Sequence, residues 1–329
     1  MKILITGGSG FIGSHLAQEY LGRGDEVCVI DDLSTGQISN ISEFEQNKNF
    51  NLVTDTILNY GLMSHLIEKC DLVVHLAAAV GVSYIIDNPL KSIQTNIRGS
   101  EIVLELVNKF GKKIVLASSS EVYGKDTHTG LKEDDDIIYG PSTTWRWSYA
   151  ASKLIDEFMG LAYFRTKKLG VVIVRFFNII GPRQTGFYGM VVPRFIKQAL
   201  DNEPITVYGD GKQSRTFTYV KDAVEAVMKL AECDNASGEV VNIGGTTEIS
   251  IGELAVKIKE KLNSKSEIKY IPYEQVYPKH FEDMMRRVPS VEKLKRLVKY
   301  IPQTDLDTTL DKTIEYLRED GADGDSGRD

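Results

Sequence analysis

The chain has 329 residues, of which 42% are hydrophobic and 26% are charged, values that are ordinary for a globular protein with a well-buried core. Its net charge of -7 argues against a nucleic-acid partner, because a phosphate backbone is bound by a basic surface. No apolar run approaches the roughly 20 residues that span a bilayer, and a strand pattern at the N-terminus leaves no room for a cleavable signal. We therefore expect a cytoplasmic protein with no membrane partner.

Cysteine and histidine usage predicts neither a disulfide scaffold nor a metal site. Cys28, Cys70 and Cys233 are far apart in the sequence, and the histidines form no group with ligand spacing. Cys28 and Cys70 lie in or beside β-branched runs, so we expect both to be small core residues in a reducing compartment. The polar segment 321–329 (GADGDSGRD) is predicted to be a disordered tail.

The first half of the chain alternates short apolar runs with longer helical patterns. Helical periodicity is clear at Gly13–Gly24 and Pro89–Phe110. Strands that alternate with helices indicate βαβ units, so the predicted fold class is α/β, with a doubly wound parallel sheet of the Rossmann type. The runs expected to be buried parallel strands are Lys2–Thr6, Glu26–Asp31, Leu72–Leu76, Lys113–Ala117 and Val171–Phe176.

After about residue 178 the pattern changes, because Gly and Pro cluster and the helical segments become shorter. We expect a smaller C-terminal α/β domain that binds substrate over the carboxyl edge of the sheet, where ligands bind in open α/β folds. The predicted division is 1–178 for the dinucleotide-binding domain and 179–320 mainly for the substrate domain. A later strand, centred on Val240–Ile243, is expected to return to the first domain from about 216–245.

A glycine-rich turn, Gly7 to Gly13 (GGSGFIG), directly follows the first predicted strand and opens the first predicted helix. Gly7, Gly10 and Gly13 supply a tight turn and close backbone approach to a pyrophosphate at a helix N-terminus. A tight turn without a ligand is the alternative interpretation. Asp31 ends the second strand, where a carboxylate accepts hydrogen bonds from a ribose 2′-OH and repels a 2′-phosphate, so NAD is favoured over NADP. Asp32 could do the same or could simply begin the loop.

Tyr149 and Lys153 form the candidate acid/base pair. Their i, i+4 spacing in the helical segment Trp147–Met159 places both side chains on one face. A nearby ammonium stabilises a tyrosinate and makes it a better base at neutral pH. Ser118, Ser119 and Ser120 follow the fourth predicted strand, so a hydroxyl there can carry a proton between substrate and Tyr149.

Together these residues resemble the extended short-chain dehydrogenase/reductase family, in its NAD-dependent branch of nucleotide-sugar epimerases, dehydratases and decarboxylases. The resemblance extends from Lys2 to about Asp320. The segments that carry it are GGSGFIG (7–13), IDDLSTG (30–36), HLAA (75–78), SSSEVYG (118–124), YAASK (149–153), RFFNIIGPRQ (175–184), VYGDGKQSRTFTYVKD (207–222) and NIGG (242–245).

The resemblance implies a bound NAD that is reduced and re-oxidised in each turnover, a UDP-sugar substrate, Ser119 as the proton-shuttling hydroxyl and a homodimer formed through the helix that carries Tyr149. For substrate binding it implies Ser119, Tyr149, Asn178, Arg215 and Arg287, of which Asn178 and the two arginines match positions that hold the nucleotide diphosphate. The cofactor contacts that it implies are Gly7, Gly10, Phe11, Ile12, Gly13, Asp31 or Asp32, Asp55, Leu76, Ala77 and Lys153. Apolar residues that could serve the dimer or the core are Phe158, Met159, Leu161, Ala162 and Phe164.

Ser120 and Glu121 bear on the fate of the 4-keto intermediate that oxidation at the sugar C4 produces. Dehydratases of this branch carry Asp-Glu at this pair, so Ser-Glu disfavours dehydration, whereas UDP-glucuronate decarboxylases carry Ser-Glu. Arg146–Ala150 (RWSYA), with Gly140 and Pro141, and Glu282–Ser290 (EDMMRRVPS) also resemble decarboxylases. The triple serine and GPRQTGFYGMVVPRF resemble UDP-hexose 4-epimerases. An ionised Glu121 would repel a substrate carboxylate unless Arg287 or another cation compensates.

We therefore place a UDP-sugar 4-epimerase first, a UDP-glucuronate decarboxylase close behind and a 4,6-dehydratase third. A binding protein for NAD and a nucleotide sugar without turnover is an alternative of another class, although intact Tyr149, Lys153 and Ser119 count against it. A simple reductase that releases NADH is a further alternative.

Overall fold

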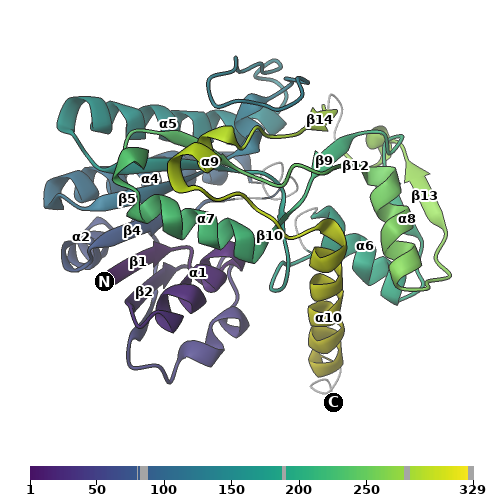
Figure 1. The fold of residues 1–329 in the computed structure, drawn as a ribbon, viewed down its shortest axis with the longest axis horizontal. Helices are drawn as coiled ribbons and strands as arrows, with labels where there is room; N and C mark the ends of the chain where they lie inside the picture. The colour runs from purple at the N-terminus through teal and green to yellow at the C-terminus, as the bar shows by residue number, and fades with distance from the viewer. Residues whose placement is uncertain (80, 82–87, 187–189, 278–281, 325–329) are drawn as a thin grey trace.

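The computed structural model describes residues 1–79, 81, 88–186, 190–277 and 282–324. Figure 1 shows a large parallel sheet with helices on both faces, built mainly from the N-terminal half of the chain. A smaller group of helices and short strands from the C-terminal half lies beside it.

The large sheet has seven parallel strands in the order β11-β6-β5-β4-β1-β2-β3. The order reverses between β1 and β4, and in open α/β sheets this switch point opens a crevice at the carboxyl ends of the strands. The fold class predicted from the sequence is confirmed. The strands are β1 (Lys2–Thr6), β2 (Glu26–Asp31), β3 (Phe50–Thr54), β4 (Leu72–His75), β5 (Lys113–Ser119), β6 (Val171–Phe176) and β11 (Val240–Ile243).

Three differences separate the observed strands from the expected ones. The edge strand β3 was missed, because its sequence FNLVT alternates only weakly and its side chains are at most half-buried. The serine-bearing strand is therefore β5, the fifth along the chain, and it continues through Ser119. β4 ends at His75, one residue before the expected end.

Helices cover both faces of the sheet. α1 and α7 pack on one face and enclose the first core, and α9 packs against α7 and β11; α2, α4 and α5 enclose the second core on the other face (Figure 1). Because α7 and β11, and later α9, belong to the larger part while α8 and α10 belong to the smaller one, the chain passes between the two parts more than once. The helices are α1 (Phe11–Gly22), α2 (Tyr60–Lys69), α4 (Pro89–Phe110), α5 (Arg146–Lys167), α7 (Val220–Glu232) and α9 (Glu292–Val298).

The smaller part packs α6, α8 and α10 around a third core with short strands at its side. β9 lies between β12 and β14, β8 pairs with β13, and β7 pairs with β10. These elements all follow residue 178 in the chain, and the division into two domains stays a prediction. The elements are β7 (Ile179–Ile180), α6 (Val191–Leu200), β8 (Ile205–Tyr208), β9 (Ser214–Thr216), β10 (Thr218–Tyr219), β12 (Glu248–Ser250), α8 (Ile251–Lys261), β13 (Ile268–Ile271), β14 (Arg286–Arg287) and α10 (Leu306–Gly324).

The predicted disordered tail begins too early. α10 continues to Gly324, four residues into the segment, because each residue added to an existing helix gains a backbone hydrogen bond at little extra cost. Residues 325–329 lie outside the described residues.

Short 3-10 turns connect several elements: η1 (Ile38–Asn40), η2 (Ser42–Phe44), η3 (Ser120–Tyr123), η5 (Asp234–Ala236) and η6 (Tyr273–Gln275). All three cysteines are free thiols. Cys70 is buried as predicted, whereas Cys28 is half-buried at the edge of the second core. Across the described ranges, no helix combines the length and apolar character needed to cross a membrane.

Candidate active site

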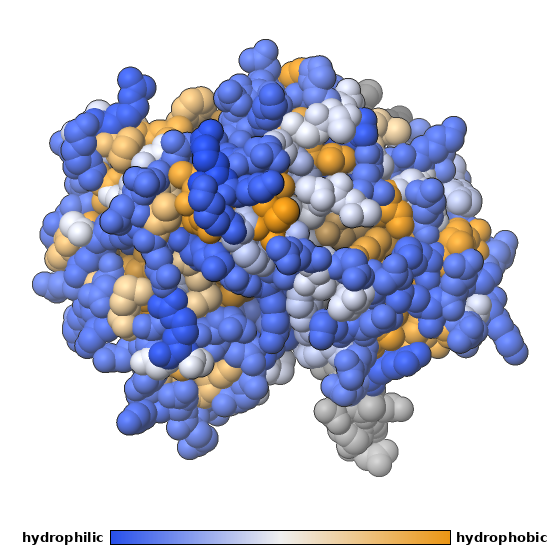
Figure 2. Space-filling model, in the orientation of Figure 1, coloured by the Kyte–Doolittle hydropathy of each residue, from blue (hydrophilic) through white to orange (hydrophobic). Residues whose placement is uncertain are grey.

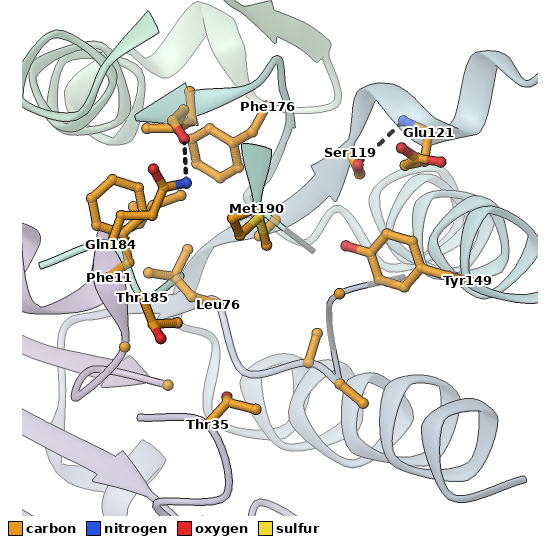
Figure 3. Close-up of a pocket in the computed structure, with 18 of the residues that line it drawn as sticks. Phe11, Thr35, Leu76, Ser119, Glu121, Tyr149, Phe176, Gln184, Thr185 and Met190 are labelled. Carbon is orange, nitrogen blue, oxygen red and sulfur yellow. Dashed lines mark hydrogen bonds between the residues drawn. The ribbon is translucent and has the colours of Figure 1, made fainter. Parts of the chain in front are cut away.

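A cavity of about 530 Å³ opens at the carboxyl edge of the large sheet and continues against the smaller part. The face of the molecule seen in Figure 2 is largely hydrophilic, with scattered hydrophobic patches, and Figure 3 shows side chains from both parts facing this cavity. Its volume lies in the range of small-molecule sites. Every site residue predicted from the sequence lines it: Gly7, Gly10, Phe11, Ile12, Gly13, Asp31, Asp32, Asp55, Leu76, Ala77, Ser119, Ser120, Glu121, Tyr149, Lys153, Asn178, Arg215 and Arg287.

The glycine-rich turn leaves no room for side chains. Gly7 has a φ of +71°, and a Cβ there would lie 2.9 Å from the Ala77 backbone. A Cβ on Gly13 would lie 2.4 Å from the Gly7 carbonyl oxygen. Only glycine allows β1, α1 and the segment after β4 to approach this closely, and the turn thus opens the N-terminus of α1 toward the cavity.

Three carboxylates line the predicted adenosine side. Asp31 accepts hydrogen bonds from the Ser9 amide at 2.9 Å and the Leu33 amide at 2.9 Å, and burial raises the pKa of its carboxyl. Asp32 accepts from the Ser34 amide at 3.0 Å at the start of the loop and also lines the cavity. Asp55 accepts from the Thr56 amide at 2.7 Å and the Asn59 side chain at 3.0 Å.

The chain chemistry on this side fits NAD. A glycine-rich turn before a helix N-terminus suits a pyrophosphate, and the buried Asp31 carboxylate suits an unphosphorylated ribose. Leu76 and Ala77 line the wall after β4, where the Ala77 amide donates to Thr6 Oγ1 at 3.1 Å.

Ser119 and Tyr149 turn their hydroxyls toward the same part of the cavity from β5 and α5 (Figure 3). Burial, and next the negative charge of Glu121, raise the pKa of Tyr149, while a hydrogen bond with Ser119 lowers it. Ser119 Oγ also accepts the Glu121 amide at 3.2 Å, which fixes the serine at the start of η3. The hydroxyls of Ser119 and Tyr149 are therefore positioned for proton transfer between them.

Lys153 lines the cavity one turn after Tyr149, on the same face of α5, as its spacing predicts. Its ammonium donates to Asp156 Oδ2 at 3.1 Å, and both side chains are almost fully buried. Removing one partner of such a buried pair leaves an uncompensated charge, so Asp156 fixes the lysine beside the cavity. This contact was not predicted from the sequence, although the two residues have an i, i+3 spacing.

Glu121 is held between two arginines. Arg287 Nη1 donates to Glu121 Oε1 at 2.7 Å, and Arg146 Nη2 lies 3.4 Å from Glu121 Oε2. Burial acts to raise the pKa of Glu121, but the charges of Arg146, Arg287 and Arg215 outweigh it and hold the pKa below its ordinary value. Arg287 Nη1 also donates to Ser120 Oγ at 3.1 Å. Glu121 is therefore an ionised carboxylate with compensating cations.

A second carboxylate, Asp283, continues this cluster toward the smaller part. Its Oδ1 lies 3.1 Å from Arg215 Nη2 and 3.3 Å from Arg146 Nη2, and its Oδ2 accepts from the Tyr273 hydroxyl at 2.8 Å. Burial, followed by the charge of Arg287, lowers the pKa of Arg215 to about 10, which leaves it charged at neutral pH. Three arginines thus face two carboxylates, and the cluster carries one excess positive charge.

Glu282, the residue before Asp283, binds this segment to residues of the larger part. Glu282 accepts from Lys125 Nζ at 2.7 Å and from the Trp147 indole at 3.0 Å. A Cβ on Gly140 would lie 2.4 Å from Glu282 Oε2, so the glycine makes room for this contact. Met284 then packs against Trp147 in a small buried cluster.

On the far wall, Asn178 donates its side-chain amide to the Thr216 carbonyl at 2.8 Å, which orients it beside β9. Arg194 lies 3.8 Å over the Tyr208 ring, and Tyr277 packs edge-on against Tyr208. Asn178, Arg194, Tyr208 and Tyr277 all line the cavity.

The sequence analysis did not assign Arg146, Asp283, Tyr273, Arg194 or Tyr208 to the site. The first two lie within the segments RWSYA and EDMMRRVPS, whose resemblance to decarboxylases was the available signal. Arg194 and Tyr208 lie within the quoted segments GPRQTGFYGMVVPRF and VYGDGKQSRTFTYVKD, whereas Tyr273 lies in none of them.

The family described as GDP-mannose 4,6 dehydratase matches residues 4–313 of this chain. The chain belongs to this family. Membership in the GDP-mannose 4,6 dehydratase family agrees with the extended short-chain dehydrogenase/reductase resemblance, and the proteins similar to this chain carry out different reactions.

A UDP-N-acetyl-α-D-glucosaminuronate decarboxylase of Bacillus cytotoxicus is 43% identical over 319 residues, which cover 97% of this chain and 98% of the relative. UDP-glucuronic acid decarboxylase 1 of Xenopus tropicalis is 36% identical over 97% of this chain and 72% of its own length. The solved structure of a UDP-glucuronic acid 4-epimerase from Bacillus cereus, in complex with UDP-glucuronic acid and NAD, is 30% identical, with a TM-score of 0.88 over 97% of this chain and 99% of that one. The chain is thus similar to enzymes that act on UDP-linked sugars, and these relatives favour decarboxylation over the epimerisation that the sequence analysis placed first.

Proposed function

We propose that this protein is an NAD-dependent decarboxylase of a UDP-linked hexuronate, with UDP-N-acetylglucosaminuronate as the first substrate to test. The observation that carries the proposal is the ionised Glu121 held by Arg287 and Arg146 in the cavity that also contains Tyr149. The decarboxylase relatives in Bacillus cytotoxicus and Xenopus tropicalis support the same reaction.

NAD would be held by the glycine-rich turn at its pyrophosphate and by Asp31 at its adenosine ribose. Lys153 lines the cavity near Tyr149 and would hold the nicotinamide ribose. When bound, NAD⁺ supplies the hydride acceptor for oxidation at C4 of the sugar.

In the first step, Tyr149 removes the C4 hydroxyl proton, with Ser119 as the shuttling hydroxyl between substrate and tyrosine. The negative charge of Glu121 opposes formation of the tyrosinate, while Arg287 favours it. A buried base of raised pKa is strong once it is formed, and Arg287 supplies nearby positive charge.

In the second step, the product of C4 oxidation is a β-keto acid. The C5–C6 bond breaks, its electron pair enters the C4–C5 enolate, and the enolate oxygen is stabilised by the hydroxyls of Tyr149 and Ser119 before C5 takes a proton. Arg287 and Arg146 compensate Glu121, so a substrate carboxylate can enter beside it. Loss of CO₂ then removes a negative charge from the vicinity of Glu121. Reduction of the C4 ketone, with Tyr149 returning the proton to the C4 oxygen, would complete the turnover, so that substrate and product differ by CO₂ alone.

A UDP-hexuronate 4-epimerase is the second candidate, because the Bacillus cereus enzyme binds UDP-glucuronic acid in a closely similar fold. Both candidates share the first step and the need for a positively charged cluster. A 4,6-dehydratase is third, because Ser120 offers a hydroxyl hydrogen-bonded to Arg287 where that reaction requires an acid.

The decisive experiment is incubation of the NAD-loaded protein with UDP-N-acetylglucosaminuronate, UDP-glucuronate, UDP-glucose and UDP-N-acetylglucosamine, followed by mass spectrometry and NMR. We expect a uronate to lose the mass of one CO₂ while the neutral sugars are unchanged. An unchanged mass with inverted C4 would establish the epimerase instead. No change in any sugar would favour the binding protein without turnover.

Arg287→Gln tests the cluster, and Arg286→Gln is its matched control. Arg286 is the preceding residue of β14 but turns outward to pair with Glu248. We expect Arg287→Gln to lower decarboxylation by about 10² or more, because Glu121 loses its nearest cation, and Arg286→Gln to change it by less than about threefold. Equal effects of the two variants would contradict a specific role for Arg287.

A further inference from the structure

One carboxylate in the site is shared by two guanidinium groups that come from different parts of the molecule. Asp283 Oδ1 lies 3.3 Å from Arg146 Nη2 on α5 and 3.1 Å from Arg215 Nη2 on β9. The charges of Arg146 and Arg215 outweigh burial and hold the pKa of Asp283 below its ordinary value, so it is ionised. The same oxygen atom thus joins the two parts electrostatically.

The two arginines have separate further contacts. Arg146 approaches Glu121, at the end of the cavity where we place CO₂ loss. Arg215 donates Nη1 to the Ser214 carbonyl at 2.8 Å and faces the side where we place the diphosphate. Because guanidinium has five N–H donors, Arg215 retains donors for a phosphate, but Asp283 opposes an incoming anion by its charge.

Asp283 itself is fixed in place. Tyr273 donates to its Oδ2 at 2.8 Å, and the Met284 amide donates to its Oδ1 at 2.8 Å. Met284 is buried against Trp147, and Glu282 is bound to Lys125 and Trp147. The carboxylate therefore cannot follow Arg215 when that arginine turns toward a ligand.

We propose that Asp283 is a positioning residue that holds Arg146 against Glu121 and competes with the substrate diphosphate for Arg215. This competition weakens binding of the nucleotide, so that UDP-sugar products also leave more readily. The same carboxylate keeps Arg146 in a fixed position. The proposal rests on the proposed function for the position of the diphosphate and for the role of Glu121.

The test is Asp283→Asn in the NAD-loaded full chain, with two readouts that should move in opposite directions. Calorimetric titration with UDP should show binding about tenfold tighter, because a negative charge beside the diphosphate has been removed. kcat for the uronate should fall by about tenfold or more, because Arg146 loses its anchor. A purely structural role would weaken both, and that result would overturn the proposal, as would unchanged UDP affinity.

Glu282→Gln is the matched control, because it neutralises the adjacent carboxylate, which is directed toward Lys125 and Trp147 instead of the arginines. UDP affinity should stay within about twofold of the unmodified protein. An equal gain in affinity would show that the effect is one of general charge and would overturn the assignment to Asp283.

A double-mutant cycle with Arg146→Lys tests the route to Glu121. If Asp283 acts through Arg146, the loss of kcat in the double variant will be clearly smaller than the product of the two single losses. Losses of kcat that multiply in full would overturn the proposed action of Asp283 through Arg146. If Asp283→Asn does not fold, Tyr273→Phe keeps the charge of Asp283 and removes only the hydrogen bond to its Oδ2. kcat should then fall while UDP binding does not become tighter, and tighter UDP binding in this variant would overturn the charge competition.

These readouts separate the two proposals. UDP binding reports on Asp283 and Arg215 whatever happens to the sugar. If no uronate is decarboxylated but UDP still binds more tightly to Asp283→Asn, the proposed function fails and the competition for Arg215 stands.

Discussion

Tyr149 illustrates how the environment of a single side chain sets its chemistry. Burial and the Glu121 carboxylate both raise the pKa of its hydroxyl, and Ser119 opposes them through a hydrogen bond. The proton must therefore leave in a site where Arg287, which also lines the cavity, supplies positive charge. The balance of these charges, more than the tyrosine itself, decides whether the base forms.

Tyr149→Phe should lower turnover of the uronate by about 10² to 10⁴, because it removes the proton acceptor while keeping the ring that fills the site. Binding of NAD, measured by fluorescence titration, should change by less than about threefold. A variant with full activity would refute the proton-transfer role. Tyr139→Phe, which lies outside the cavity lining and keeps its stack on Trp147, serves as the control.

Glu121 and Asp283 should make the free energy of unfolding depend on pH in the acidic range. Arginine neighbours lower the pKa of each carboxyl below its ordinary value of 4.5 or 3.8, against the effect of burial. A depressed folded-state pKa contributes stability above the unfolded pKa and loses it as pH falls through the folded one. The free energy of unfolding should therefore fall as pH decreases below 4.5.

Denaturant unfolding at a series of pH values measures this slope. The double variant Glu121→Gln with Asp283→Asn should show a shallower decrease, with about one fewer proton taken up on unfolding. Glu26→Gln, at an exposed position, should leave the slope unchanged. An identical slope in the double variant would contradict the prediction.

Among the secondary-structure elements, the turn between β1 and α1 has the strictest geometric demand. Gly13 lies so close to the Gly7 carbonyl that any Cβ would collide with backbone, whereas Gly22, at the end of the same helix, has no atom within 4 Å of a Cβ position. The two glycines therefore make a matched pair for testing the turn.

Gly13→Ala should lower the melting temperature and weaken NAD binding by at least about tenfold, because the turn must open to admit the methyl group. Gly22→Ala should leave NAD binding unchanged and stabilise the helix slightly, because alanine loses less conformational freedom on folding. Thermal melts and NAD titrations check both. Wild-type affinity in Gly13→Ala would show that the turn does not hold the cofactor.

α5 presents two different faces. Tyr149 and Lys153 face the cavity, while Phe158 and Ile155 are 63% and 41% exposed on the outer face. Of the apolar residues noted in the sequence, Met159, Leu161 and Phe164 pack against the second core. Phe158 and Ala162 remain exposed. Core packing therefore explains the first three residues, whereas the last two are accessible for a dimer contact.

At the scale of the whole molecule, the exposed apolar residues on α5 support the proposed homodimer, because neighbouring exposed apolar side chains mark interaction sites. We expect light scattering after size exclusion to give a dimer for the unmodified chain and a monomer for Phe158→Asp. Tyr270→Ser removes an aromatic that is 55% exposed on β13, in the smaller part, and should stay dimeric. A monomeric unmodified chain at micromolar concentration would contradict the prediction.

Local patterns in the sequence were sufficient to predict most of the sheet and to group many of the residues that line the cavity. The β-branched runs at β1, β2, β6 and β11 have the bounds predicted for them. The carboxyl ends of parallel strands meet at one edge, so Asp31, Ser119 and the glycine-rich turn could be brought together from strand positions alone. The edge strand β3 was missed because its weak alternation carries little information.

Only the tertiary structure decided the charge balance of the site. Arg287 and Glu121 are 166 residues apart in the chain, and Asp283 meets Arg146 and Arg215 from a segment of the smaller part that no periodicity connects to either. A long guanidinium side chain can reach many partners, and the free energy of an ion pair depends on burial and on every neighbouring charge. The sequence by itself was therefore sufficient to predict the dinucleotide-binding fold and to place Tyr149 and Lys153 on one face of a helix. Only the tertiary structure decided that Glu121 is an ionised carboxylate compensated by arginines.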